Sequence, residues 1–379
     1  MRKEVCDGAD SSQFWYTTMT TPVRLLVLVL TAVFLHGNQD ATPKAMRDPL
    51  TMGQVLVWMD GGAESLRVEQ LVERQGVDFV PTAELLDSLK VLNAKPSLLE
   101  KLKRAKVAHS GVGSAKEQAA YAELFMCLRK ANSGADAEAE RECLAAETDE
   151  PSTAGFALGL LAKRRGKSSE ALRFFSAAVE AAPTIPDNHN YLASASQKLG
   201  QLDRAEAEYR EAIRLDPAYE TPVSNLADLY LAKNDPILAE RYARQAITLM
   251  KEDAYAHNEL GMALCKQQKF DECLAELREA ERLEPDNAFR HAQLGTILWN
   301  TGKCSDAVPE FQQATKLEPS NSYTHLRLLT LLLQLRRKED AQTECAAVQA
   351  VLHTTKSCAE IAAIVRKDTE KAPKLCEQP

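Results

Sequence analysis

Aromatic residues, long apolar runs and excess basic charge are all scarce in this chain of 379 residues. Aromatic residues make up only 6% of the sequence and runs of β-branched residues are few, so we expect no β-sheet. The formal net charge of −8 provides no basic surface for sequence-independent binding of nucleic acid. No Cys-x-x-Cys pair occurs, which argues against a structural zinc ion or a dithiol redox centre.

The residue patterns of catalysis are also missing. No nucleophile stands beside a base, and no acid pair is set in non-repetitive sequence. Gly111-Val-Gly113 lacks the following Gly-Lys and the preceding strand of a phosphate-binding loop. The sequence therefore predicts a protein that is not an enzyme and that has no cofactor.

The amino terminus carries one apolar run, Leu25 to Leu35, which is interrupted only by Thr31 and preceded by Arg24. A membrane-spanning helix needs about 20 apolar residues, whereas an export signal has a core of about 7–15 residues with a basic flank. We interpret 1–37 as a signal peptide, which predicts an exported, periplasmic or extracytoplasmic protein. An uncleaved anchor in the inner membrane, or a buried helix of a cytosolic protein, remains an alternative.

The most informative pattern is a repeat of 34 residues, on which Leu215, Leu249, Leu283 and Leu317 recur. Such a period indicates stacked helical units that cannot bury their apolar faces alone. In blocks beginning at 152, 186, 220, 254, 288 and 322, position 7 is always leucine, and positions 8, 20 and 27 are mostly small. Glycine recurs at position 15, where a residue with positive φ can end the first helix of a pair.

These columns resemble the tetratricopeptide repeat family, which has Leu-Gly at positions 7 and 8, Ala at 20, an aromatic residue at 24, Ala at 27 and Pro at 32. The blocks at 186–219, 254–287 and 288–321 carry the pattern most clearly. The resemblance implies an all-α fold, a right-handed superhelical solenoid of helix-turn-helix repeats. We predict six repeats over 152–355, a degenerate repeat over 118–151, and a capping helix and tail over 356–379.

A segment without the repeat, 48–106, reads as four short helices with Trp58 and Phe79 as apolar anchors. It is similar to small helical modules that precede repeats in some bacterial exported proteins. Linkers are expected at 38–47 and 107–117. The degenerate repeat that follows has Leu124, Ala137 and Leu144 at core positions.

Nine cysteines exceed what a cytosolic helical protein needs, and cleavage of a signal would leave eight, which can pair completely. A disulfide between Cys127 and Cys143 would link the two helices of the degenerate repeat and stabilise it. Cys358 could pair with Cys345 or with Cys376. We expect Cys265 and Cys273 to pack as small buried residues.

Four histidines share block position 4, which raises the question of a metal ladder: His189, His257, His291 and His325. Equivalent residues of packed helices lie about 8–10 Å apart, too far to converge on one ion at about 2 Å. We therefore expect a structural role for these histidines and no metal.

The resemblance implies a function in binding, because tetratricopeptide domains usually contact extended peptides on a concave face formed by the first helices. Aromatic side chains there would hold apolar groups of a partner, and asparagine would bond its backbone. Carried over to this chain, those positions give candidate partner-binding residues: Asn190, Lys198, Tyr255, Asn258, Lys266, Phe289, Trp299 and Tyr323.

We interpret the chain as a non-catalytic scaffold for a protein or peptide partner, with membrane contact only through the amino-terminal segment. Two alternatives remain open. The solenoid could be an architectural subunit of a cell-envelope or secretion assembly, or an accessory domain of an enzyme complex.

Overall fold

The computed structural model describes residues 50–51, 54–55, 65–91, 94–107, 124, 126–130, 136–146, 151–369 and 376. The predicted signal segment 1–37, the linker 38–47 and Trp58 lie outside these residues, as does most of the predicted linker 107–117. None of the helices in the described part of the chain combines the length and apolarity that crossing a bilayer requires.

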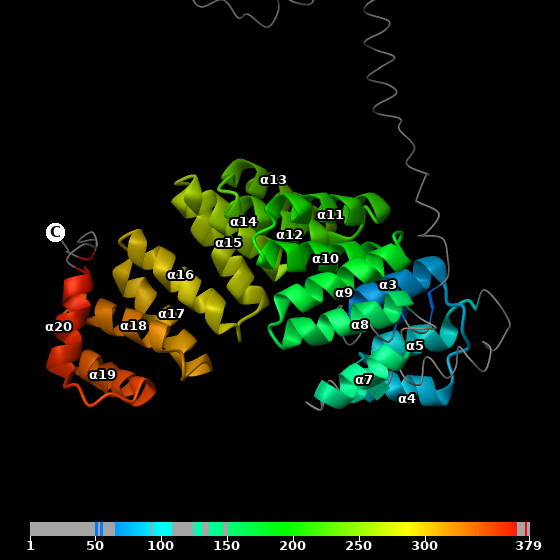
Figure 1. Ribbon diagram of the computed structural model, residues 1–379. Helices are drawn as coiled ribbons and strands as arrows, with labels where there is room; N and C mark the ends of the chain where they lie inside the picture. The colour runs from blue at the N-terminus through cyan, green and yellow to red at the C-terminus, as the bar shows by residue number, and fades with distance from the viewer. Residues whose placement is uncertain are drawn as a thin grey trace, which may run out of the picture.

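The described residues form an all-helical array of antiparallel helix pairs that stack in one direction, with the amino-terminal helices at one end and α20 at the other (Figure 1). This confirms the predicted fold class. The pairs are α8 (Pro151–Arg164) with α9 (Ser168–Ala181), α10 (Pro186–Lys198) with α11 (Leu202–Leu215), α12 (Glu220–Ala232) with α13 (Pro236–Leu249), α14 (Ala254–Lys266) with α15 (Phe270–Leu283), α16 (Ala288–Asn300) with α17 (Cys304–Leu317), and α18 (Ser322–Gln334) with α19 (Lys338–Leu352).

Small residues bring the two helices of a pair close together. A Cβ atom added to Gly159 would lie 2.5 Å from Cε1 of Phe175, a ring that is itself 1% exposed. Glycine at block position 15 has positive φ, as expected: 72° at Gly166 and 75° at Gly200. The turn keeps this conformation even without glycine, because Gln268 at the same position has a φ of 64°.

Each position-4 histidine joins three segments of the repeat. His189 Nδ1 lies 2.7 Å from a carboxylate oxygen of Glu208 on α11, and its Nε2 lies 2.9 Å from the carbonyl oxygen of Pro183 in the preceding turn. Both neighbours are hydrogen-bond acceptors, so both ring nitrogens donate when the imidazole is protonated. The same arrangement recurs at the other three histidines, which lie opposite Glu276, Glu310 and Glu344.

The segment before the repeats forms α3 (Ser65–Gln75), α4 (Ala83–Val91) and α5 (Pro96–Arg104). Thr51 and Gln54 form a reciprocal capping box, with Gln54 N donating to Thr51 Oγ1 at 3.2 Å. Gly76 has a φ of 73° and ends α3. β-Pairing among the described residues is limited to isolated parallel bridges of Val77 to Leu50 and Val107, which form no sheet. No strand is present among the described residues.

This amino-terminal module shares one apolar core with the first repeat. Figure 1 shows α3 beside α8 and α9 at this end of the array. Helix α8 is buried continuously from Thr153 to Ala162. A helix buried on all sides must be covered by more than its repeat partners. Phe156 and Leu160, at positions 5 and 9 of the first block, are 3% and 4% exposed.

The degenerate repeat differs from its predicted register. In α7 (Asp136–Ala146), Ala139 and Cys143 are fully buried, whereas Leu144 is 45% exposed. Ala137 is also exposed. The expectation that Ala137 and Leu144 occupy core positions is therefore wrong. A disulfide between Cys127 and Cys143 turns the Cys143 face of α7 inward.

The eight described cysteines form four disulfides: Cys127–Cys143, Cys265–Cys273, Cys304–Cys376 and Cys345–Cys358. The interpretation of Cys265 and Cys273 as packed thiols is wrong, since the turn between α14 and α15 brings them within bonding distance. At the carboxyl end, Ser357 and Glu360 cap α20 (Cys358–Thr369) reciprocally, as predicted.

Candidate functional site

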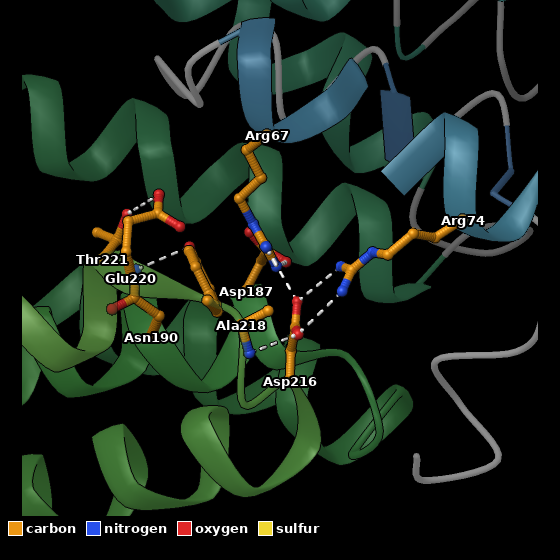
Figure 2. Close-up of polar contacts among 9 residues, drawn as sticks. Arg67, Arg74, Asp187, Asn190, Asp216, Ala218, Glu220 and Thr221 are labelled. Carbon is orange, nitrogen blue, oxygen red and sulfur yellow. Dashed lines mark hydrogen bonds and ion pairs between the residues drawn. The ribbon is translucent and has the colours of Figure 1, made fainter. Parts of the chain in front are cut away.

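The first helices of successive pairs form one face of the array, which we call the inner face, and a side chain from the amino-terminal module is inserted into it (Figure 2). Arg67 of α3 is 5% exposed. Its Nη1 lies 3.0 Å from Asp216 Oδ2, and its Nη2 lies 3.3 Å from Asp187 Oδ2. The guanidinium carbon stands 3.4 Å from the ring centroid of Tyr219, in cation–π contact.

A second arginine of α3 completes this buried cluster. Arg74 Nη2 lies 3.1 Å from Asp216 Oδ2, and the Asp216 side chain is 1% exposed. The other oxygen of Asp216 accepts a hydrogen bond from the backbone N–H of Ala218 at 3.1 Å. Two arginines therefore share one buried carboxylate, and the module is joined to the second repeat by charge, in addition to its apolar packing against the first repeat.

The cluster shifts the acidities of its own members. Burial acts to raise the pKa of Asp216, but the charge of Arg67 and the bonds from Arg74 outweigh it, and the net pKa is lowered. Burial acts to lower the pKa of Arg67, but the charges of Asp187 and Asp216 raise it overall. Both groups therefore stay ionised at neutral pH.

A polar chain continues from the Arg67 site along the inner face. Asn190 Nδ2 donates to the Tyr219 hydroxyl at 3.1 Å, and Asn225 Nδ2 donates to Asn190 Oδ1 at 3.0 Å. Burial raises the pKa of Tyr219 well above its usual value, so this hydroxyl remains protonated. The chain of bonds orients side chains from α10, from α12 and from the turn between α11 and α12.

Next to Arg67 the inner face opens into a cavity of about 440 Å³. This volume is within the range of about 300–1,000 Å³ that is usual for ligand pockets. Its lining includes four carboxylates, Glu220, Glu252, Asp253 and Glu284, and one cation, Arg67. Burial raises the pKa of Glu220 and of Asp253. Among the described residues Glu220, Glu252 and Asp253 make no ion pair, although Asp253 Oδ1 accepts the backbone N–H groups of Tyr255 and Ala256 at the start of α14. The lining therefore carries more negative than positive charge.

The predicted partner-binding residues divide into two groups, the first of which is open to solvent. Phe289 is 65% exposed and Tyr323 is 59% exposed, and these two side chains occupy position 2 of successive repeats. Arg327 donates to the Tyr323 hydroxyl. Lys198 and Lys266 are exposed as well. An incoming chain can reach all four of the predicted residues in this group.

The second group already has partners within the chain, which differs from the expectation. Asn190 is 4% exposed and belongs to the bonded chain described above. Trp299 is 7% exposed, and its indole N–H donates to Gln334 Oε1 at 2.9 Å. Tyr255 is half-buried and lies beside the Asp228 carboxylate, and burial raises its pKa. These three side chains are therefore held in place by neighbours within the chain.

Asn258, the remaining predicted residue, is 4% exposed and its Nδ2 donates to Glu259 Oε1 at 3.0 Å. Burial, followed by the charge of Asp228, raises the pKa of Glu259 to about 7. The Asn258 Oδ1 atom accepts no hydrogen bond among the described residues. The Asn258 amide oxygen is therefore a buried acceptor that has no donor among the described residues.

Sequence reasoning missed Arg67, Asp187, Asp216 and Tyr219. The positions of both aspartates are visible in the repeat: Asp187 is at position 2, and Asp216 precedes the proline that ends its block. Nothing in the sequence marks Arg67 among the many charged residues of the module. Its role depends on docking between segments about 120 to 149 residues apart.

The helix pairs, the position-15 turns and the inner face define a repeat solenoid of the kind used for protein recognition. Residues 186–219 and 254–287 match the sequence model described as tetratricopeptide repeat, and residues 293–350 match a second model of the same description. The chain is therefore a tetratricopeptide repeat protein.

Solved structures agree on this fold. A chain of the APC/C hetero-tetramer Cut9–Hcn1 is 16% identical with a TM-score of 0.55, and the match covers 83% of this chain and 62% of that one. A tetratricopeptide repeat protein from Parabacteroides merdae is 16% identical with a TM-score of 0.51, covering 66% and 99%. At such identities the likeness shows the fold alone. No curated protein matches the chain in sequence.

Proposed function

We propose that this protein is a non-catalytic scaffold that holds an extended segment of a partner protein on its inner face, from the cavity beside Arg67 toward Phe289 and Tyr323. Tetratricopeptide repeats are generally scaffolds for protein interaction. The observation that carries the proposal is the cavity of about 440 Å³ between α10, α12 and α14, which opens on the same face as the exposed aromatic residues.

The lining supports a particular kind of partner segment. Glu220, Glu252 and Asp253 offer carboxylates without an ion pair among the described residues, so they favour lysine or arginine side chains. Phe289 and Tyr323 offer apolar rings to side chains further along the segment. A segment that alternates basic and apolar residues fits both features.

The amino-terminal module takes up part of the same face in this account. Arg67 and Arg74 hold α3 against the second repeat, so the partner segment meets a face that is already filled at its amino-terminal end. The open length for the partner then runs from α12 to α18.

We also propose that the protein acts outside the cytoplasm. Disulfides form and persist in oxidising compartments. The pairing of all eight described cysteines supports this location, as does the signal-like segment at Leu25 to Leu35.

A paired substitution tests the proposed function. Proteins captured by wild-type chain from the native host are compared with those captured by Phe289→Ala combined with Glu252→Lys. Both side chains are exposed, so the fold should be unaffected, which circular dichroism checks. Phe270→Ala is the matched control, because this ring is 43% exposed but is not on a first helix.

The account predicts that a specific partner is lost from the Phe289 and Glu252 variant and retained by the Phe270 control. An unchanged partner list would contradict it. In that case recognition would lie on the amino-terminal module or on the face opposite the inner face. Such a result would favour the alternative of an architectural subunit in a larger assembly.

A further inference from the structure

The fourth repeat has a carboxylate at a position that is apolar in the three repeats before it. Block position 28 is Val179, Ile213 and Ile247 in the first three repeats, whereas the fourth has Glu281. In the third repeat, Ile247 lines a pocket together with His257 and Glu276. Position 28 of one repeat therefore lies beside the position-4 histidine of the next, and Glu281 brings an extra acid to that place.

The result is a group of three potential metal ligands from three helices. His291 Nδ1 of α16 lies 3.3 Å from Glu281 Oε1 of α15 and 2.9 Å from Glu310 Oε2 of α17. The three ligand atoms lie within 4.8 Å of one another. Metal–ligand bonds of about 2.0–2.2 Å in a tetrahedral site place ligand atoms about 3.3–3.6 Å apart. Small side-chain rotations would open the group to that spacing.

The surroundings of His291 suit a ligand. Its Nε2 lies 2.9 Å from the carbonyl oxygen of Pro285. Metal-bound histidines commonly donate their second ring N–H to a carbonyl, which fixes the tautomer and directs the other nitrogen at the metal. The two glutamate side chains are 24% and 20% exposed, so an ion has a path of entry and water can supply a further ligand.

We propose that Glu281, His291 and Glu310 form a binding site for one divalent first-row transition-metal ion, with Zn²⁺ as the probe. One imidazole nitrogen and two carboxylate oxygens are a donor set that these ions accept. The ion would bridge α15 to α16 and α17, and so would fasten the fourth repeat to the fifth. None of the three residues lines the cavity beside Arg67, so the metal site does not depend on the proposed partner binding.

The repeat itself offers a variant that removes the third ligand while keeping the fold. Glu281→Val restores the residue type found at position 28 of the first repeat. Isothermal titration with Zn²⁺ on untagged protein should give one site in the wild type, with a Kd of about 10 μM or tighter. We expect Glu281→Val to weaken this binding about 10- to 100-fold. Glu344→Gln, which alters the two-residue contact at His325, should leave it unchanged.

A gain of binding provides the converse test. Thr315 occupies position 28 before His325 and Glu344. Thr315→Glu should therefore create a second site and raise the stoichiometry from one to two ions per chain. Visible absorption of the Co²⁺ form reports coordination by protein ligands in each case. Wild-type protein that binds no Zn²⁺, or Glu281→Val protein that binds it as well as wild type does, would overturn the proposal.

Discussion

Arg67 provides the sharpest test of how the amino-terminal module is attached to the repeats. Arg67→Met keeps most of the apolar stem but removes the charge that faces Asp187 and Asp216, at 3.3 and 3.0 Å. Both aspartate side chains are at most 3% exposed, and only Arg74 remains beside Asp216. Breaking a buried ion pair on one side typically costs about 3–5 kcal/mol, because the other charge stays buried.

That cost should appear in the module before it appears in the distant repeats. Hydrogen exchange of the α3 amides measures the free energy of local opening, and we expect this energy to fall by about 3–5 kcal/mol in Arg67→Met. Amides of α18, at the other end of the array, should change little. Adding Asp187→Asn and Asp216→Asn to Arg67→Met should recover part of the loss, since no buried charge is then unpaired.

The matched control is Lys103→Met on the same module. Lys103 Nζ lies 2.6 Å from Glu100, but both side chains are half exposed, and ion pairs of this kind contribute little. The reasoning would be refuted if Arg67→Met changed the exchange of α3 no more than Lys103→Met did. Arg67 would then be an inserted side chain without a stabilising role.

Three further predictions concern the repeats. Gln268→Gly should raise the free energy of unfolding in urea by about 1 kcal/mol, because Gln268 has a φ of 64° that strains any residue with a Cβ. Burial acts to lower the pKa of His189, but Glu208 and a carbonyl raise it overall. The stability that this histidine contributes is therefore present below about pH 6.5 and is lost as pH rises through its folded-state pKa, so wild type and His189→Gln should differ more in urea unfolding at about pH 6 than at about pH 9. The Cys304–Cys376 disulfide spans a separation of 72 residues, and Cys376→Ser should cost about 4 kcal/mol in the chain-entropy account, measured by urea unfolding under non-reducing conditions.

Each of these three has a clear contrary result. A lower unfolding free energy in Gln268→Gly would show that the contacts of the Gln268 side chain stabilise the fold by more than its positive φ costs. An equal effect of His189→Gln at both pH values would mean that the imidazole is neutral in the fold. Non-reducing peptide mapping that finds Cys376 as a free thiol would remove the third prediction.

The repeat architecture could be predicted from the sequence because each helix pair solves the same packing problem. Gly159 and Phe175 show why: the ring fits only because the facing residue has no Cβ, and that relation recurs as a column of small residues. Positive φ at Gly166 and Gly200 followed in the same way from one residue type at one position. Packing and turn requirements that recur at a fixed period can therefore be recognised in the sequence.

The parts that sequence reasoning missed depend on contacts between distant segments. Arg67 has no periodic position, and only docking of α3 reveals that it faces Asp216. The register of α7 was wrong because Leu144 looked like a core residue, while Cys143 takes the inner position. Trp299 and Asn190 were predicted from family positions. A family position gives the place of a residue on its helix, but not the neighbour to which its side chain forms a hydrogen bond.

The central claim, that the inner face holds an extended segment of a partner, is tested most directly by photo-crosslinking in the native host. A photoreactive residue is placed at Thr221 in the cavity lining, at Phe289, and at Ile237, which is 64% exposed away from the cavity. The account predicts that one partner is crosslinked from Thr221 and Phe289 but not from Ile237. A partner that crosslinks from Ile237 alone would contradict the claim.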